Sequence, residues 1–208
     1  MDRTPALVLG IGNLLWADEG FGVRCVEALH QRYEWPPGVQ LLDGGTQGLY
    51  LVNDVCAARR VLVLDAIDFG DPPGTLRVVR GDDVPSFAIA KKMSMHQTGF
   101  QDVLAAAAMM GHSPDEVVLI GVQPEQLEDF GGSLTPKVSA RLDDVVAEAV
   151  KELTAWGFPP RLRTGAPAEP LLGPGLDRRS YEMLRPTDAE ACRAGDMRVL
   201  AQAKGGEA

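Results

Sequence analysis

Three residues of this sequence, Glu19, Asp65 and His96, have side chains that bind divalent metals and stand where apolar runs end or helical patterns begin. Two carboxylates and one imidazole form an O,O,N set that suits a borderline ion such as nickel or zinc, with coordination positions left open. In an open α/β sheet, ligands bind beyond the carboxyl ends of the strands. The three residues therefore predict a metal-binding reaction site at that edge of the sheet.

Each of the three also has a purely structural interpretation. Asp18 is a candidate N-cap, which puts Glu19 in the first turn of a helix, where the dipole favours a carboxylate by about 0.3–1 kcal/mol. Asp65 ends an apolar strand, so it either caps a turn or faces a polar crevice. A capping box begun at Ser94 puts His96 in a first helical turn, where the imidazole stays neutral and either binds a metal or bonds locally. Residue types and positions alone leave both interpretations open.

Two other chemistries find less support in the sequence. A dinucleotide site needs G-x-G-x-x-G after the first strand, but Gly10 and Gly12 are followed by Leu15 at the third position. A nucleophilic hydrolase needs an activated serine or cysteine, and the chain has no G-x-S-x-G elbow. Cys25 and Cys56 lie in helical patterns without an evident histidine and acid beside them.

The segment from 43 to 46, with the sequence DGGT, ends a predicted strand with two adjacent glycines. It is either a tight turn with Thr46 as the N-cap of the next helix or a mobile lip over the crevice.

The elements that must position these residues alternate along the chain. Apolar runs typical of strands buried on both faces cover 6–11, 39–43, 60–67, 75–79 and 116–122. Helical spacing covers 21–33, 46–58, 97–110 and 136–156. This alternation predicts an α/β fold, a three-layer sandwich in which helices flank a mostly parallel central sheet of about five strands. The segment 75–79 follows a D-P-P-G turn and is expected to be an edge or antiparallel strand.

Length and composition limit the classes of protein that fit. The 208 residues predict one α/β domain, 1–158, followed by a Pro- and Gly-rich extension, 159–208, which is expected to be loosely attached. The net charge of -9 argues against a nucleic-acid surface, and no apolar stretch is long enough for a membrane helix. Three widely spaced cysteines suggest neither a disulfide framework nor a zinc site, so a cytoplasmic location is expected.

Six segments, taken in order, closely resemble the hydrogenase maturation protease family of the nickel-iron uptake hydrogenases. They are GIGNLLWADEGFGV, DGGTQGLYL, VLDAID, MSMHQTGFQDVL, LIGVQPE and SLTPKV. The resemblance spans about residues 6 to 155. Any single segment would be weak evidence, but six in the same order are specific.

The resemblance implies an endopeptidase that acts on the precursor of the large subunit of a nickel-iron hydrogenase. Family members remove a C-terminal peptide once nickel has been inserted, normally on the C-terminal side of a histidine or arginine. The family's metal-site residues fall on Glu19, Asp65 and His96. The nickel is then carried by the substrate and no resident cofactor is expected, while Asp43 and Gly44 are candidates for admitting the tail.

Two rival functions remain at this point. A nickel chaperone without hydrolysis would use the same three ligands, but it would bind the metal in the absence of substrate. An oxidoreductase would instead bind a nicotinamide cofactor at Gly10 and Gly12.

Overall fold

The computed structural model describes residues 3–84, 100–173 and 175–184 and has a mostly parallel sheet at its centre. The sheet contains β1 (Thr4–Ile11), β3 (Val39–Gly45), β4 (Ala58–Ala66), β5 (Leu76–Arg80) and β6 (Glu116–Val122). Their order is β3-β1-β4-β6-β5. The first four strands of that order run parallel, and β5 pairs antiparallel with β6 at the edge. The prediction of about five mostly parallel strands, with 75–79 as an antiparallel edge, is confirmed.

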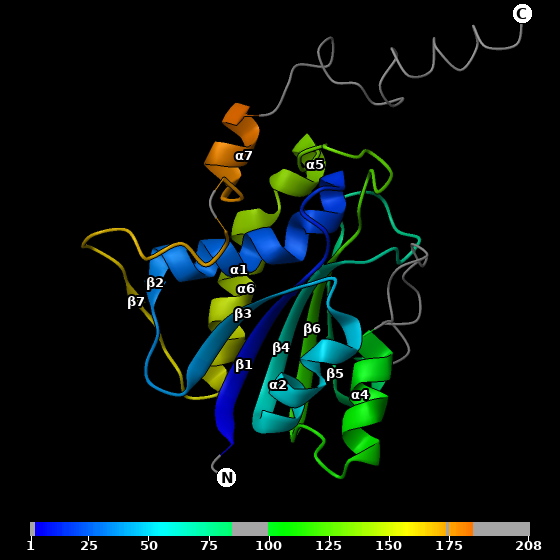
Figure 1. The fold of residues 1–208 in the computed structure, drawn as a ribbon, viewed down its shortest axis with the longest axis vertical. Helices are drawn as coiled ribbons and strands as arrows, with labels where there is room; N and C mark the ends of the chain where they lie inside the picture. The colour runs from blue at the N-terminus through cyan, green and yellow to red at the C-terminus, as the bar shows by residue number, and fades with distance from the viewer. Residues whose placement is uncertain (1–2, 85–99, 174, 185–208) are drawn as a thin grey trace, which may run out of the picture.

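Helices cover both faces of the sheet. On one face lie α1 (Phe21–Arg32) and α6 (Leu142–Ala155), and on the other lie α2 (Val52–Ala57) and α4 (Phe100–Met109) (Figure 1). Because successive strand residues point to opposite faces, Val8 of β1 joins the core under α1 and α6, whereas Leu7 and Leu9 join the core under α2 and α4. Strands buried on both sides explain the continuous apolar runs. In the described part of the chain, no helix is both long and apolar enough to cross a bilayer.

Two of the expected helices are interrupted. The 46–58 pattern begins as a 3-10 turn, η2 (Gly48–Leu51), before α2, because Gly48 has φ +53° and cannot start a regular helix. The 136–156 pattern is divided into α5 (Pro136–Ser139) and α6. For the 97–110 pattern, α4 starts at Phe100, and the preceding residues lie outside the described part.

The described part of the extension packs on α1. Its first residues form β7 (Arg161–Leu162), which pairs with β2 (Tyr33–Glu34). The described chain then runs back along α1, where Leu172 is buried, and reaches α7 (Arg178–Leu184) (Figure 1). Side chains of α1 supply polar partners to the backbone of this described part, at Ala168, Glu169 and Leu176. The loose attachment of the extension as a whole stays a prediction. The domain boundary at residue 158 remains a prediction, and 185–208 lie outside the described residues.

Candidate active site

Three glycines bring the connection between β1 and α1 onto the end of β4. A Cβ at Gly12 would lie 1.7 Å from the carbonyl oxygen of Glu19, and Gly12 has φ +135°, which side chains rarely allow. A Cβ at Gly22 would lie 2.0 Å from the carbonyl oxygen of Leu64, and one at Gly10 would lie 2.5 Å from that of Gly22. Both glycines of the G-x-G pattern are therefore used for backbone packing around Glu19.

Asp18 is a buried acceptor that joins three separate segments of the chain. Its Oδ2 accepts hydrogen bonds from the backbone N–H groups of Glu125 and Gln126, both at 2.9 Å. The N–H of Thr135 donates to Oδ1 at 2.7 Å and the Thr135 hydroxyl donates to Oδ2 at 3.1 Å. The prediction that Asp18 caps the following helix is wrong, since Gly20 occupies the N-cap of α1 and no side chain caps it. The carboxylate instead satisfies donors from the LIGVQPE and SLTPKV segments.

The first two expected metal ligands both reach the carboxyl edge of the sheet. Glu19 lies in the 3-10 turn η1 (Ala17–Gly20), which contacts β4, and Asp65 is the next-to-last residue of β4. Both are buried, at 6% and 5% exposure. Asp65 Oδ1 accepts a hydrogen bond from the N–H of Ala66 at 2.8 Å. Burying a carboxylate is costly without polar or cationic partners. Two buried carboxylates at one edge of a sheet are therefore typical of a ligand-binding site.

The third expected ligand, His96, lies outside the described residues. Within 3–84, 100–173 and 175–184, no three His, Cys, Asp or Glu side chains gather as a metal site would require. The complete Glu19, Asp65 and His96 set therefore stays a prediction.

Gln123 fixes the loop that follows Asp65. It is buried at the end of β6, and its Oε1 accepts hydrogen bonds from the N–H groups of Phe69 at 2.7 Å and Asp71 at 3.2 Å. Its Nε2 donates to Asp68 Oδ1 at 3.0 Å. One amide thus holds the backbone beyond β4 in place and, with it, the position of Asp65.

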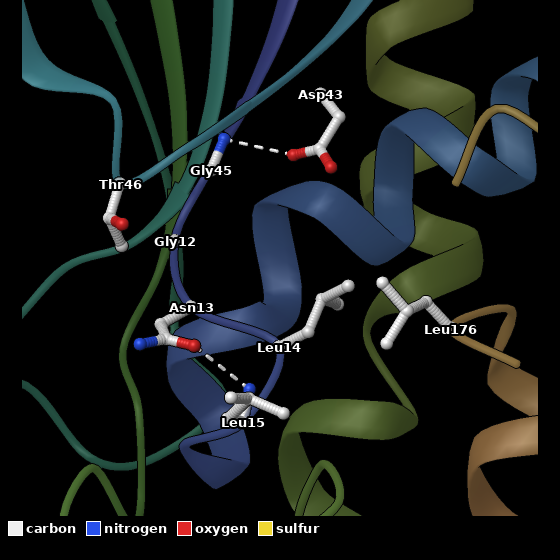
Figure 2. A pocket seen from close by; sticks show the side chains of 8 residues that line it. All are labelled: Gly12, Asn13, Leu14, Leu15, Asp43, Gly45, Thr46 and Leu176. Atoms are coloured by element: carbon white, nitrogen blue, oxygen red, sulfur yellow. Dashed lines mark hydrogen bonds between the residues drawn. The ribbon is translucent and has the colours of Figure 1, made fainter. Parts of the chain in front are cut away.

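A pocket of about 210 Å³ opens beside η1, at the carboxyl ends of β1 and β3. Figure 2 shows the side chains around it, with Leu176 of the extension facing Leu14. The lining residues are Gly12, Asn13, Leu14, Leu15, Asp43, Gly45, Thr46 and Leu176. The pocket therefore combines the β1–η1 connection, the DGGT segment and the extension.

Asp43 is the acidic group of this pocket. Partial burial raises the pKa of its carboxyl, while a hydrogen bond from the Gly45 N–H, at 2.9 Å, and the charge of Arg24 act to lower that pKa. Asp43, Gly44 and Gly45 are the last residues of β3, and only Thr46 of the DGGT segment lies in the turn that follows. The alternative role of Thr46 as an N-cap is not seen, because Gln47 holds that position before η2 without a side-chain bond.

Sequence reasoning missed two residues that organise this region. Gln123 stands in the LIGVQPE segment, and a polar residue directly after an apolar strand could have suggested a buried amide. Arg24 is only 5% exposed and donates to Glu27 at 2.9 Å and to the carbonyl of Leu176 at 2.5 Å. The (i, i+3) spacing of Arg24 and Glu27 could have suggested the ion pair, but nothing in the sequence pointed to Leu176.

Comparisons with known proteins agree with this architecture. A family model described as hydrogenase maturation protease matches residues 23–152. The hydrogenase expression/formation protein HupD of Rhodobacter capsulatus is 56% identical over 95% of this chain and 93% of its own length. The hydrogenase 2 maturation protease of Escherichia coli is 42% identical over 73% of this chain and 92% of its own.

The solved structure of the hydrogenase maturating endopeptidase HybD from Escherichia coli has a TM-score of 0.72 and 39% identity, covering 78% of this chain and 99% of that one. The same sheet flanked by helices is thus found in an endopeptidase. The chain belongs to the hydrogenase maturation protease family and is a peptidase, as the six segments had predicted.

Proposed function

We propose that this peptidase removes a C-terminal peptide from the nickel-loaded precursor of the large subunit of a nickel-iron hydrogenase. Glu19, Asp65 and His96 bind the nickel that the precursor carries, through coordination positions that the precursor leaves open. The metal is thus part of the substrate and serves as the signal that its insertion is complete. A precursor without nickel offers the three side chains nothing to hold.

The observation that supports this proposal best is the placement of Glu19 and Asp65. Both carboxylates are withdrawn from water at the same edge of the sheet, on η1 and β4, which contact each other. The backbone of Glu19 is confined by Gly12, and Asp18 beside it is locked by four hydrogen bonds. Such rigid support suits a site that must recognise one metal geometry.

The reaction is peptide hydrolysis. Water adds to the carbonyl carbon, the C–N bond breaks, and the proton goes to the departing amine. A divalent ion close to the scissile bond can polarise its carbonyl or lower the pKa of a bound water. By holding the nickel, the three side chains place the neighbouring bond in a fixed position, which removes much of the entropic cost of reaching the transition state.

The proposal is tested by incubating the protein with nickel-loaded and nickel-free forms of the cognate precursor and reading the C-terminal mass. Loss of the peptide from the loaded form alone is the expected result. Cleavage of both forms would eliminate the nickel requirement. Cleavage of neither, together with tight nickel binding by the protein alone in equilibrium dialysis, would favour a chaperone.

The ligand assignment is tested by His96→Ala, with His112→Ala as the matched control, because His112 is exposed in the turn after α4. The first change should abolish cleavage and the second should leave it unaltered. Cleavage by His96→Ala at the wild-type rate would show that His96 is not a ligand of the nickel.

A further inference from the structure

The extension contributes a wall to the pocket at the carboxyl edge of the sheet. Leu176 lines the pocket together with Leu14 and Leu15 (Figure 2). These two leucines belong to the connection that leads from β1 into η1, the turn that carries Glu19. Leu176 is 37% exposed and Leu15 is 41% exposed. The extension thus places an apolar side chain, open to solvent, next to the segment that holds the proposed nickel ligand.

Buried polar groups of α1 hold this part of the extension in place. The guanidinium of Arg24 donates to the carbonyl of Leu176 at 2.5 Å and lies 5.5 Å from the centre of the Tyr181 ring. Glu27 pairs with Arg24 through one carboxylate oxygen and accepts the N–H of Arg178 at its other, at 3.2 Å. Arg24 is almost fully buried, so an N–H of its guanidinium that lacked an acceptor would be costly. The carbonyl of Leu176 supplies that acceptor.

A second set of contacts fixes α7 to α5 and to the loop before it. Arg178 donates to Ser139 Oγ at 2.7 Å and to Glu182 Oε1 at 2.9 Å. The hydroxyl of Ser133 donates to the same Glu182 oxygen at 2.9 Å. Ser133 opens the SLTPKV segment, whose Thr135 is bound to Asp18. The extension is therefore tied to the same scaffold that supports the site.

The extension lies outside the part of the chain that the family model matches. The family model matches residues 23–152, so the whole extension follows the matched region. The Escherichia coli endopeptidase structure is covered over 99% of its length by 78% of this chain. HupD of Rhodobacter capsulatus, in contrast, matches 95% of this chain. A feature absent from the matched core but adjacent to the site is suited to choosing among substrates.

We infer that Leu176 is a specificity-determining residue, which with Leu14 and Leu15 encloses an apolar side chain in the C-terminal segment of the precursor. The inference rests on the proposed function, since it assigns part of the same substrate to a neighbouring pocket. The three leucines supply an apolar wall, and Gly12 and Gly45 line the rest of the pocket with backbone alone.

The test is Leu176→Ala, with Leu162→Ala as the control. Leu162 belongs to the same extension and is 69% exposed, but it lies in β7, away from the pocket. With the nickel-loaded cognate precursor, Leu176→Ala should raise KM roughly tenfold and change kcat less than about twofold, as expected for one lost apolar contact that binds ground state and transition state alike. Leu162→Ala should keep both constants.

Leu176→Met, which keeps an apolar side chain of similar volume, should restore KM to within about threefold of the wild type. Equal KM values for Leu176→Ala and Leu162→Ala would overturn the inference, and so would a loss confined to kcat. Failure of the wild-type protein to cleave the loaded precursor would instead overturn the proposed function, so the two failures are distinguishable.

Discussion

The carboxyl edge of the sheet and the C-terminal extension are held by different kinds of hydrogen bond. At the edge, backbone N–H groups converge on the carboxylate of Asp18. Along the extension, side chains of α1 bind backbone carbonyls, Arg24 to Leu176 and His30 to Glu169. The edge therefore depends on one particular residue, whereas Glu169 and Leu176 of the extension are held through their backbone carbonyls. Beyond Leu176, side chains of the extension also take part, since Arg178 and Glu182 bind Ser139 and Ser133.

The largest effect on stability is expected from Asp18→Ala, which removes the hydrogen bonds that hold the carboxyl edge together. Asp18 is fully buried, and its loss leaves the N–H groups of Glu125, Gln126 and Thr135 without their acceptor. The free energy of unfolding should fall by roughly 3–5 kcal/mol. Urea denaturation followed by circular dichroism measures it.

The control for this change is Asp143→Ala. Asp143 has a side chain that is 78% exposed and pairs with Arg32 at the surface, so its removal should cost about 0–1 kcal/mol. If the two variants unfold at the same urea concentration, the hydrogen bonds of Asp18 do not hold the edge together.

Gly12→Ala should disturb the site more than the fold. Its Cβ would lie 1.7 Å from the carbonyl oxygen of Glu19, so the backbone of Glu19 must move. A displacement of about 1 Å can lower a rate on the order of 100-fold, and precursor cleavage should fall by about that factor. Gly111→Ala is the matched control, because Gly111 also has a positive φ, +72°, but no atom lies within 4 Å of its added Cβ. Equal rates for the two variants would show that Gly12 does not position Glu19.

Arg24→Met breaks the attachment of the extension. It removes the donor to the Leu176 carbonyl and leaves Glu27 unpaired in a site that is 13% exposed. Stability should fall by about 2–3 kcal/mol, below the range for fully buried pairs, and limited proteolysis should cut within 175–184.

The double change Arg24→Met with Glu27→Leu distinguishes the ion pair from the attachment. Replacing both charges by apolar groups should recover most of the stability. Rapid proteolysis should persist, because the bonds to the Leu176 carbonyl and to the Arg178 N–H are both lost. Protection of 175–184 in the double variant would mean that other contacts hold the extension.

The same contrast explains which features the sequence could predict. The inner strands β1, β4 and β6 are buried on both faces and must be apolar, so their runs were found. Asp71 to Gly74 marked the turn before the antiparallel edge strand β5. Glu19 and Asp65 were singled out because polar residues directly after buried strands are few, and both lie at the carboxyl edge. Their role as metal ligands stays a prediction. These predictions depended on local patterns, which are formed by residues close together in the sequence.

Features that depend on distant partners were missed. Asp18 looked like a local helix cap, but its partners lie more than a hundred residues away, at Glu125, Gln126 and Thr135. The composition of the extension likewise contains no sign of the side chains on α1 that bind its described part. In both cases the hydrogen-bond partner, and not the residue itself, determined the structure.

The smallest effect is expected at Asp43, where the edge and the extension meet in one pocket. Burial raises the pKa of its carboxyl above the ordinary 3.8, and the Gly45 N–H and the charge of Arg24 partly oppose the rise. A carboxyl whose pKa is higher in the folded state binds more protons when folded. Asp43 therefore favours folding most at low pH, and that contribution is lost as pH rises through its folded pKa.

Asp43→Asn keeps an oxygen that can accept the Gly45 N–H and removes the titration. The variant should gain stability relative to the wild type as pH rises through this window, by a modest amount because Asp43 is only half-buried. Urea denaturation of both proteins across that pH range measures the difference. The gain should be larger when Arg24 is also replaced by Met, since Arg24 lowers the pKa of Asp43. A stability difference independent of pH would show that Asp43 does not titrate abnormally, and an unchanged gain in the Arg24→Met background would show that the anchor of the extension exerts no electrostatic effect on the pocket.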